Sequence, residues 1–458
     1  MAIRRFFAER AFLPQGWAER VLIEIGDEGM VSRVSVESAP GDSERASGPV
    51  LPAMPNLHSH AFQRAMAGRA EHAGGSEDSF WTWRQVMYGF VGKLDPDSME
   101  AIAAQLYVEM LKAGYGSVAE FHYLHHDPEG RPYADPAEMS WRIFAAARTA
   151  GIALTHLPVL YATGGFGGIA AGNAQRRFVN DADAFLRIVD RVAQAAKDAP
   201  DLRIGIAPHS LRAVPLGLLE QVVLELDSLL PGAPIHIHIA EQVREVEECI
   251  AWSGARPVEW LLDHAAVNYR WCLVHATHMT EAETERLARS GAVAGLCPTT
   301  EANLGDGFFP APAYLAAGGK FGIGSDSHIS VSPIEELRWL EYGQRLRQRR
   351  RNLLHAENGG SVGEYLWREA AQGGAEALGF SAGRIAAGCR ADFIVLDPEC
   401  AILAELPREA VIDAVVFSGN INPVRDVMVG GRWIVREGHH AREDDIAARY
   451  RAALKQIG

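Results

Sequence analysis

Residues 55–60 read Pro55-Asn56-Leu57-His58-Ser59-His60 and follow an apolar run that begins at Val50. Strand side chains alternate between two faces, so His58 and His60 are expected to point the same way from the end of a strand. Far downstream, His238 follows a similar apolar run, with Glu241 three residues beyond it. Histidines gathered at strand ends predict a metal site, because neutral imidazole nitrogen is a preferred zinc ligand.

Strand-like apolar runs alternate with amphipathic, helix-like stretches from residue 51 to about residue 380. Eight repeats of a strand and then a helix predict the α/β class and a parallel (β/α)8, or TIM, barrel over residues 53–381. An open doubly wound sheet is the alternative, but no glycine-rich phosphate turn follows the first strand. The eight predicted strands span residues 50–55, 116–122, 153–160, 202–207, 234–239, 271–275, 292–296 and 320–324.

Both ends of the chain are rich in strands instead. Residues 21–25 and 31–36 near the start are predicted strands. Near the end, residues 385–397 read as a turn and a strand, and residues 411–417 and 424–435 as further strands, with Gly430-Gly431 as a tight turn. The simplest arrangement joins residues 1–52 and 382–458 into one small β domain, a β-sandwich, that also carries a terminal helix over residues 446–457.

Composition and charge narrow the class of protein. The formal net charge of −14 argues against a nucleic-acid partner or an anionic membrane surface. No run of about 18 apolar residues is present, so no membrane span is expected. The five cysteines are odd in number and widely spaced, which fits a reducing cytoplasm. A homo-oligomer, such as a dimer, is expected because most soluble oligomers are of this kind.

Catalytic groups of a parallel barrel lie at the carboxyl ends of its strands, and the candidate residues fall at such ends. His58, His60, His238 and Asp326 form the predicted site for a divalent metal ion, with Zn²⁺ preferred and Fe²⁺ also compatible. His238 is chosen over His236, which has the same parity, because it lies nearer the end of its strand. For His278 and His328 two interpretations stay open: either they support the ligands from outside the metal site or they have no role in it.

Three residues are predicted to be catalytic. Glu241 is placed to carry a proton to a leaving group, although a carboxylate at a helix N-terminus is the alternative interpretation. His275 would orient and polarise a metal-activated water. Asp326 would share with His275 the handling of the proton that this water releases.

These residues resemble the amidohydrolase superfamily, and in particular its deaminases with a single metal ion. The run from Gly388 through Ala391-Asp392-Phe393-Ile394-Val395 is similar to that superfamily too. The resemblance covers essentially the whole chain and implies a distorted (β/α)8 barrel that hydrolyses a carbon–nitrogen bond. Members with two metal ions typically bridge them with a carboxylated lysine. No lysine lies at a predicted strand end here, so one metal ion per chain is expected.

A closer resemblance rests on five runs and concerns deiminases that convert N-formimidoyl-L-glutamate and water to N-formyl-L-glutamate and ammonia in bacterial histidine degradation. It implies a small-molecule substrate with two carboxylates, which suit the planar fork of arginine. Arg84, in the aromatic loop expected after the first strand, and Arg212, just past the fourth, are the candidates. Further predicted substrate contacts are Gln63, Tyr123 and His209. The five runs span residues 56–64, 79–84, 119–123, 209–214 and 300–307.

Two alternatives stay open. A deaminase of a purine such as guanine, or of another heterocycle, would use the same metal ligands, and the two arginines favour a dicarboxylate over a ring. A non-catalytic scaffold protein on the same barrel is the other alternative, and the complete ligand set argues against it. The alternative to a substrate-binding role for Arg84 and Arg212 is that each forms an ordinary ion pair at the surface.

Overall fold

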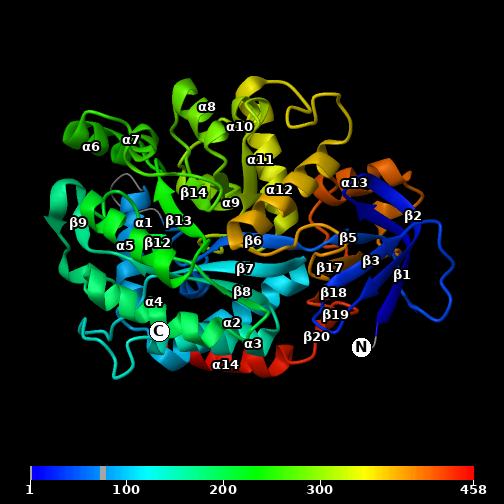
Figure 1. The fold of residues 1–458 in the computed structure, drawn as a ribbon, viewed down its shortest axis with the longest axis horizontal. Coiled ribbons are helices and arrows are strands. Elements are labelled where there is room, and N and C mark those ends of the chain that lie inside the picture. Colours follow the sequence, from blue (N-terminus) through cyan, green and yellow to red (C-terminus); the bar gives the residue numbers. More distant parts are fainter. Residues whose placement is uncertain (1–2, 73–78) are drawn as a thin grey trace.

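The computed structural model describes residues 3–72 and 79–458. Its centre is a parallel sheet in the order β11-β8-β7-β6-β16-β15-β14-β13, with β12 beside β8 (Figure 1). A bridge between Ile206 and Ile235 closes this sheet into a barrel, which confirms the predicted architecture. The strands are β6 (Met54–Ser59), β7 (Tyr115–His122), β8 (Ala153–Leu160), β11 (Leu202–Ile204), β12 (Ala207–Pro208), β13 (Ile235–Ile239), β14 (Trp271–His275), β15 (Val293–Leu296) and β16 (Lys320–Ile323).

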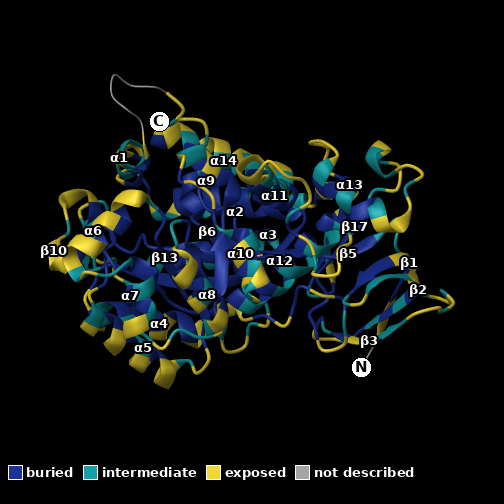
Figure 2. Cartoon of the chain, turned by 90° about the horizontal axis from the view of Figure 1, so that it is seen from above, coloured by how far each residue is buried: buried dark blue, intermediate teal, exposed yellow. Residues whose placement is uncertain are grey.

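Helices surround the barrel, so its strands are buried on both faces, and all eight residues of β7 and of β8 are buried (Figure 2). The helices after β6 and β7 are α1 (Phe80–Val91), α2 (Pro96–Ala113) and α3 (Glu138–Ala150). Those of the middle are α4 (Ala182–Ala196), α5 (Leu216–Leu229), α6 (Val243–Ser253), α7 (Pro257–His264) and α8 (Glu281–Ser290). The last are α9 (Pro298–Leu304), α10 (Ala311–Ala316), α11 (Pro333–Gln348) and α12 (Val362–Leu378).

Local sequence explains where α2 begins and ends. The Asp95 carboxylate accepts a hydrogen bond from Ser98 N at 2.7 Å, and Pro96 occupies the first turn, where its missing N–H costs nothing. Gly114 ends the helix with a φ of 104°, a conformation that glycine adopts without strain. The chain then enters β7, and the helix lies against the barrel with Tyr107 buried on its inner face.

Strands from both ends of the chain form a second sheet (Figure 1). Its order is β20-β19-β18-β17-β5-β1-β2-β3, with β4 beside β1. Gly430 and Gly431 both have positive φ in the predicted tight turn between β18 and β19. The strands are β1 (Arg4–Leu13), β2 (Gly16–Ile25), β3 (Val31–Ser35), β4 (Glu44–Arg45), β5 (Val50–Pro52), β17 (Phe393–Leu396), β18 (Val424–Val429), β19 (Arg432–Arg436) and β20 (His439–His440).

The terminal helix α14 (Glu443–Ile457) lies along α2 of the barrel. Two ion pairs join the helices, from Lys112 to Glu443 at 2.6 Å and from Arg449 to Glu100 at 2.9 Å. A short hairpin of β9 (Thr163–Gly165) and β10 (Ile169–Ala170) extends from the loop after β8. The short 3-10 helices are η1 (Ala61–Met66), η2 (Phe166–Gly168), η3 (Asn173–Gln175), η4 (Ala401–Leu403) and η5 (Arg408–Ala410).

Three predicted strands differ from the structure. Residues 50–55 are divided at Ala53, because β5 belongs to the second sheet and β6 to the barrel. Residues 202–207 are interrupted at Gly205, where a Cβ atom would lie 2.4 Å from Pro234 O. Residues 411–417 form the helix α13 (Val411–Phe417), because a short apolar run fits a buried helix as well as a strand. None of the described helices is long and apolar enough to cross a membrane.

Candidate active site

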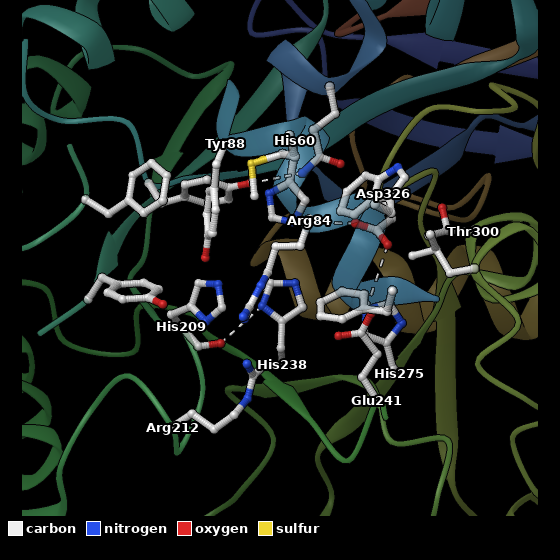
Figure 3. Close-up of a pocket in the computed structure, with 18 residues that line it drawn as sticks. His60, Arg84, Tyr88, His209, Arg212, His238, Glu241, His275, Thr300 and Asp326 are labelled. Atoms are coloured by element: carbon white, nitrogen blue, oxygen red, sulfur yellow. Dashed lines mark hydrogen bonds and ion pairs between the residues drawn. The ribbon is translucent and has the colours of Figure 1, made fainter. Parts of the chain in front are cut away.

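Four side chains with metal-ligating atoms, His58, His60, His238 and Asp326, meet at the carboxyl end of the barrel. Figure 3 shows three of them, His60, His238 and Asp326. His58 and His60 stand at the end of β6, His238 lies in β13, and Asp326 follows β16. Their ligand atoms all lie within 4.8 Å of one another, and all four residues are buried. The Oδ1 atom of Asp326 is 3.3 Å from His58 Nε2 and 3.4 Å from His60 Nε2. The structure therefore brings together the four residues that the sequence predicts as ligands.

Hydrogen bonds fix which ring nitrogens of this group carry protons. His60 Nδ1 donates to Phe121 O at 3.0 Å, and His238 Nδ1 donates to His209 O at 3.1 Å. Burial lowers the pKa of both imidazoles, so they are neutral and their Nε2 atoms are bare lone pairs.

These lone pairs face other electron-rich atoms. His238 Nε2 lies 3.0 Å from His58 Nε2, and His60 Nε2 faces the Asp326 carboxylate. Burial also lowers the pKa of His58 well below its ordinary value, and neighbouring His60 adds to this effect. Buried lone pairs that converge in this way repel one another unless a cation lies between them. Three imidazoles and one carboxylate are a donor set that fits Zn²⁺ and also Fe²⁺.

A second group of ionisable side chains borders these four. His275 Nε2 lies 3.9 Å from Glu241 Oε1 and 3.8 Å from Asp326 Oδ2, while its Nδ1 atom is 3.3 Å from Glu301 Oε1. Burial raises the pKa of Glu241 to about 7. Burial alone would lower the pKa of His275, but Glu241, Glu301 and Asp326 raise it to about 10. His275 thus stands between the carboxylates of Glu241 and Asp326.

Strained backbone is concentrated at these strand ends. Asp326 has a φ of 43° and His275 a φ of 69°, values that residues with a side chain rarely adopt. Such conformations persist only where the surroundings impose them, and they are typical of functional sites. Non-glycine residues with positive φ at the ends of β13, β14 and β16 are Ala240, His275, Ala276, Asp326 and His328.

The remaining histidines have other partners. His236 Nε2 donates to Ala377 O at 2.8 Å, so the ring is bound to the end of α12 and lies outside the four-residue group. His278 borders Gly307 beside the site, with its Nε2 atom unpaired. His328 is fully buried behind β6, where it contacts Ser59 and Ser325. Strand position separates His236 from the predicted ligand His238, and none of these three positions is predicted as a ligand.

All five residues predicted to contact substrate line one cavity at the carboxyl end of the barrel. Gln63 Nε2 donates to Tyr123 OH at 2.9 Å, and His209 Nδ1 contacts Ser210 Oγ at 3.1 Å. Arg84 does not lie in a loop as predicted, because Ser79 caps the helix α1 and Arg84 stands in its second turn. Arg212 lies between β12 and α5, as expected.

Sequence reasoning missed several residues of the cavity wall. Tyr161 directly follows the end of β8, so the strand-end rule could have found it. Tyr88 lies one helical turn after Arg84, which only an α1 prediction would have revealed. The other wall residues outside the predicted set are Phe80, Trp83, Met87, Phe178, Thr300 and Leu304.

Two arginines point into the same space, on the side of the cavity away from Glu241 and Asp326 (Figure 3). Arg84 stacks over the Trp81 ring at 4.4 Å, and Arg212 lies 5.8 Å from the same ring. Both guanidinium Nε atoms are buried without a hydrogen-bond partner, and neither side chain makes an ion pair with the described residues. Buried cations of like charge side by side are costly unless an anion compensates them.

Comparison with known proteins assigns the family. The amidohydrolase family matches residues 50–434. This range includes all four candidate metal ligands, the metal-type group of His58, His60, His238 and Asp326. The chain belongs to the amidohydrolase family. It is 54% identical to formimidoylglutamate deiminase of Pseudomonas aeruginosa over 98% of this chain and 99% of that protein.

More distant and structural relatives agree with the family. The chain is 27% identical to a 5-methylthioadenosine/S-adenosylhomocysteine deaminase of Natronomonas pharaonis, over 85% of this chain and 81% of that one. A crystal structure of an amidohydrolase from Brucella melitensis superimposes with a TM-score of 0.93 at 49% identity, covering 99% of both chains. The family and its fold therefore extend over nearly the whole molecule.

Proposed function

We propose that this amidohydrolase hydrolyses N-formimidoyl-L-glutamate to N-formyl-L-glutamate and ammonia, a step of histidine degradation. The observation that carries the proposal is a pair of arginines, Arg212 buried and Arg84 half-buried, whose Nε atoms have no hydrogen-bond partner and which line the same cavity as the histidines and carboxylates. The 54% identity to a formimidoylglutamate deiminase supports the same reaction. Within its family the chain is a hydrolase of carbon–nitrogen bonds other than peptide bonds, and the substrate is the finer assignment.

Charge complementarity orients this substrate. Arg84 and Arg212 bind its two carboxylates, because each guanidinium can donate two parallel hydrogen bonds to a carboxylate. The basic formimidoyl group then extends toward Glu241 and Asp326, whose carboxylates favour it. Gln63, whose Oε1 atom is buried and unpaired, accepts a hydrogen bond from the substrate, and Tyr123 and His209 complete this wall.

His58, His60, His238 and Asp326 would hold one divalent ion per chain, most suitably Zn²⁺. When bound, this ion lowers the pKa of water toward neutrality and polarises the group under attack. The three imidazoles and one carboxylate of these residues offer ligand atoms that all lie within 4.8 Å of one another, as a shared ion requires.

Glu241 moves the proton that the reaction requires. The oxygen of one water becomes the formyl oxygen, the bond to the terminal nitrogen breaks, and that nitrogen leaves as ammonia. Glu241 takes a proton from the water and gives it to the departing nitrogen, while His275 holds the attacking oxygen by hydrogen bonding. Asp326 accepts the second proton of the water and returns it to the departing nitrogen, so that this nitrogen gains the two protons it needs to leave as NH3 and both carboxylates are regenerated.

Product analysis tests the reaction. Protein stripped with a chelator and reloaded with Zn²⁺ is incubated with N-formimidoyl-L-glutamate, and the products are identified by proton NMR with an ammonia assay. We expect N-formyl-L-glutamate and ammonia in equal amounts. Formamide and glutamate would instead show cleavage of the other carbon–nitrogen bond and contradict the deiminase assignment.

The role of Glu241 has its own test. Glu241→Gln removes the proton carrier with little change in size, so kcat should fall about 100-fold to 10,000-fold, the usual range for a lost general acid–base. Metal content, measured by mass spectrometry of the purified protein, should stay near that of the unaltered chain. Full turnover by this variant would contradict the assigned role.

Two assignments complete the proposal. We assign the enzyme to the cytoplasm, where its cysteines, all free in the structure, would stay reduced. We also assign it a homodimeric state, which light scattering of the purified protein would reveal as twice the monomer mass. A monomer under these conditions would contradict that assignment.

A further inference from the structure

A chain of buried polar side chains lies directly behind the metal-type group. It begins at Asn56 in β6, crosses to the loop after β16, returns to β6 and ends at Glu120 of β7 and Tyr107 of α2. None of its members lines the cavity, and each is at most 1% exposed. The members are Asn56, Ser325, His328, Ser59, Glu120 and Tyr107.

The direction of each hydrogen bond follows from the carboxylate at one end. Glu120 accepts from Ser59 Oγ at 2.6 Å, from Ala61 N at 2.7 Å and from Tyr107 OH at 3.1 Å. The single hydroxyl proton of Ser59 is used in the first of these bonds. His328 Nε2, 3.2 Å from Ser59 Oγ, must therefore be protonated and donate to it.

The other nitrogen of His328 completes the pattern. Its Nδ1 atom lies 3.0 Å from Ser325 Oγ, and the neutral ring can only accept there. Ser325 Oγ in turn accepts from Asn56 Nδ2 at 2.6 Å. The Asn56 carbonyl oxygen accepts from Ser325 N at 3.1 Å and from His58 N at 3.3 Å. One tautomer of His328 thus satisfies every bond along the chain.

This arrangement joins the two segments that carry the predicted ligands. Ser59 stands between His58 and His60, and Ser325 immediately precedes Asp326. The backbones are also paired, from Asp326 N to His58 O at 3.0 Å and from His60 N to Asp326 O at 3.2 Å. Asp326 and His328 both have positive φ, which costs free energy unless the surroundings hold it. Two side chains connect the strained loop to β6: Asn56 bonds to Ser325, and His328 bonds to Ser59 between the two histidines.

We propose that His328, acting through Ser59 and Glu120, is a positioning residue that sets the affinity and geometry of the divalent ion at His58, His60, His238 and Asp326. The inference rests on the metal role assigned under the proposed function. His328 does not touch the ion or the substrate. It fixes the Asp326 carboxylate at the distance from the two histidines that a shared ion requires, as outer hydrogen bonds do in metal sites generally.

Metal affinity tests this proposal without reference to turnover. His328→Phe fills the space but removes both bonds, whereas His328→Gln keeps a donor for Ser59. The Zn²⁺ dissociation constant is measured by competition with a chromophoric chelator, and the visible absorption of the Co²⁺-loaded protein reports the ligand geometry. We expect a 10-fold to 100-fold weaker Zn²⁺ affinity and an altered Co²⁺ spectrum for His328→Phe, with partial recovery for His328→Gln.

His156→Phe is the matched control. His156 is equally buried and is bound to a serine, Ser140, at 2.9 Å, but it lies outside the metal-type group. The His156→Phe substitution should lower the melting temperature of the metal-free protein, while its Zn²⁺ affinity and Co²⁺ spectrum stay those of the unaltered chain. If His328→Phe does not fold, Ser59→Ala, which breaks the same connection, should show the weaker affinity.

Two results would overturn the inference, and they are distinguishable. Unaltered Zn²⁺ affinity and an unaltered Co²⁺ spectrum in the folded His328 or Ser59 variant would reject the positioning role alone. An unmodified chain that binds no divalent ion would reject the proposed metal site and, with it, this inference.

Discussion

Two of the three histidines that face the predicted ion are oriented by their other ring nitrogen, whereas His58 Nδ1 is buried without a hydrogen-bond partner. His60 and His238 donate through Nδ1 to backbone carbonyl oxygens, so their Nε2 lone pairs have one direction. The side-chain spacing of a strand predicted which residues meet, because His58 and His60 share a face. It could not predict the carbonyl partners, since Phe121 and His209 come from neighbouring strands whose register is set by three-dimensional packing.

At the same scale, the carboxylate-binding role proposed for Arg212 predicts a kinetic effect. Arg212→Met removes a buried cation and should lower kcat/KM for N-formimidoyl-L-glutamate about 100-fold or more, a loss typical of a truncated buried charge pair. Steady-state ammonia release measures it. Arg203→Met, which alters an arginine stacked on Phe380 away from the cavity, should leave kcat/KM unchanged. Unchanged kinetics of Arg212→Met would contradict a carboxylate-binding role.

Elements of the barrel were predictable wherever an apolar run was long and bounded by turns. Six of the eight runs matched single barrel strands, because buried parallel strands are apolar on both faces, whereas residues 50–55 were divided between the two sheets and residues 202–207 were interrupted. Residues 411–417 were not predictable, because a short, largely apolar run fits either structure and its packing against α11 and α12 decides between them. The helical state of residues 80–91 also escaped prediction, because its aromatic residues resemble a substrate-covering loop.

The packing of α12 on β16 makes a prediction at the scale of elements. Gly373 lets the helix approach the strand so closely that a Cβ atom would lie 2.0 Å from Phe321 O. Gly373→Ala should therefore lower the free energy of unfolding by about 2 kcal/mol or more, although alanine favours helices elsewhere. Urea unfolding followed by circular dichroism measures the change.

Gly217→Ala in α5 provides the comparison. No atom lies within 4 Å of its added Cβ, so this change should be neutral or should stabilise by about 0.5–1 kcal/mol. Equal effects of the two substitutions would contradict the argument that backbone contact between α12 and β16 requires glycine.

At the scale of the whole molecule, ion pairs connect the second sheet and the C-terminal helix α14 to the barrel. Arg390 lies in the loop just before β17 of the second sheet. It pairs with Asp392 at 3.1 Å and with Asp201, just before β11 of the barrel, at 2.8 Å. Sequence texture predicted that both chain ends join in one small β domain, given as a β-sandwich, and the structure shows their strands in a single sheet. Sequence texture did not predict that α14 returns to the barrel, because nothing in residues 446–457 specifies α2 as the partner.

The attachment of α14 should depend on pH. Lys112 and His439 lower the pKa of Glu443 to about 2, below its ordinary 4.5. A lowered folded-state pKa contributes stability above the unfolded value and loses it as the pH falls. The difference in unfolding free energy between the unaltered chain and Glu443→Gln, at most about 1 kcal/mol at pH 7, should shrink between pH 4.5 and about 2.

Thermal melts across this range provide the measurement. Asp444→Asn is a control in the same helical turn, because Asp444 makes no ion pair with the described residues. Its difference from the unaltered chain should change little with pH. A pH-independent difference for Glu443→Gln would contradict the assigned pairing.

The measurement that tests the central claim most directly is the rate of ammonia release from N-formimidoyl-L-glutamate beside guanine, before and after chelation and with Zn²⁺ added back. We expect rapid release from N-formimidoyl-L-glutamate alone, lost on chelation and restored by Zn²⁺. Release from guanine alone would contradict the dicarboxylate assignment, and release that survives removal of the metal would contradict the metal-dependent site.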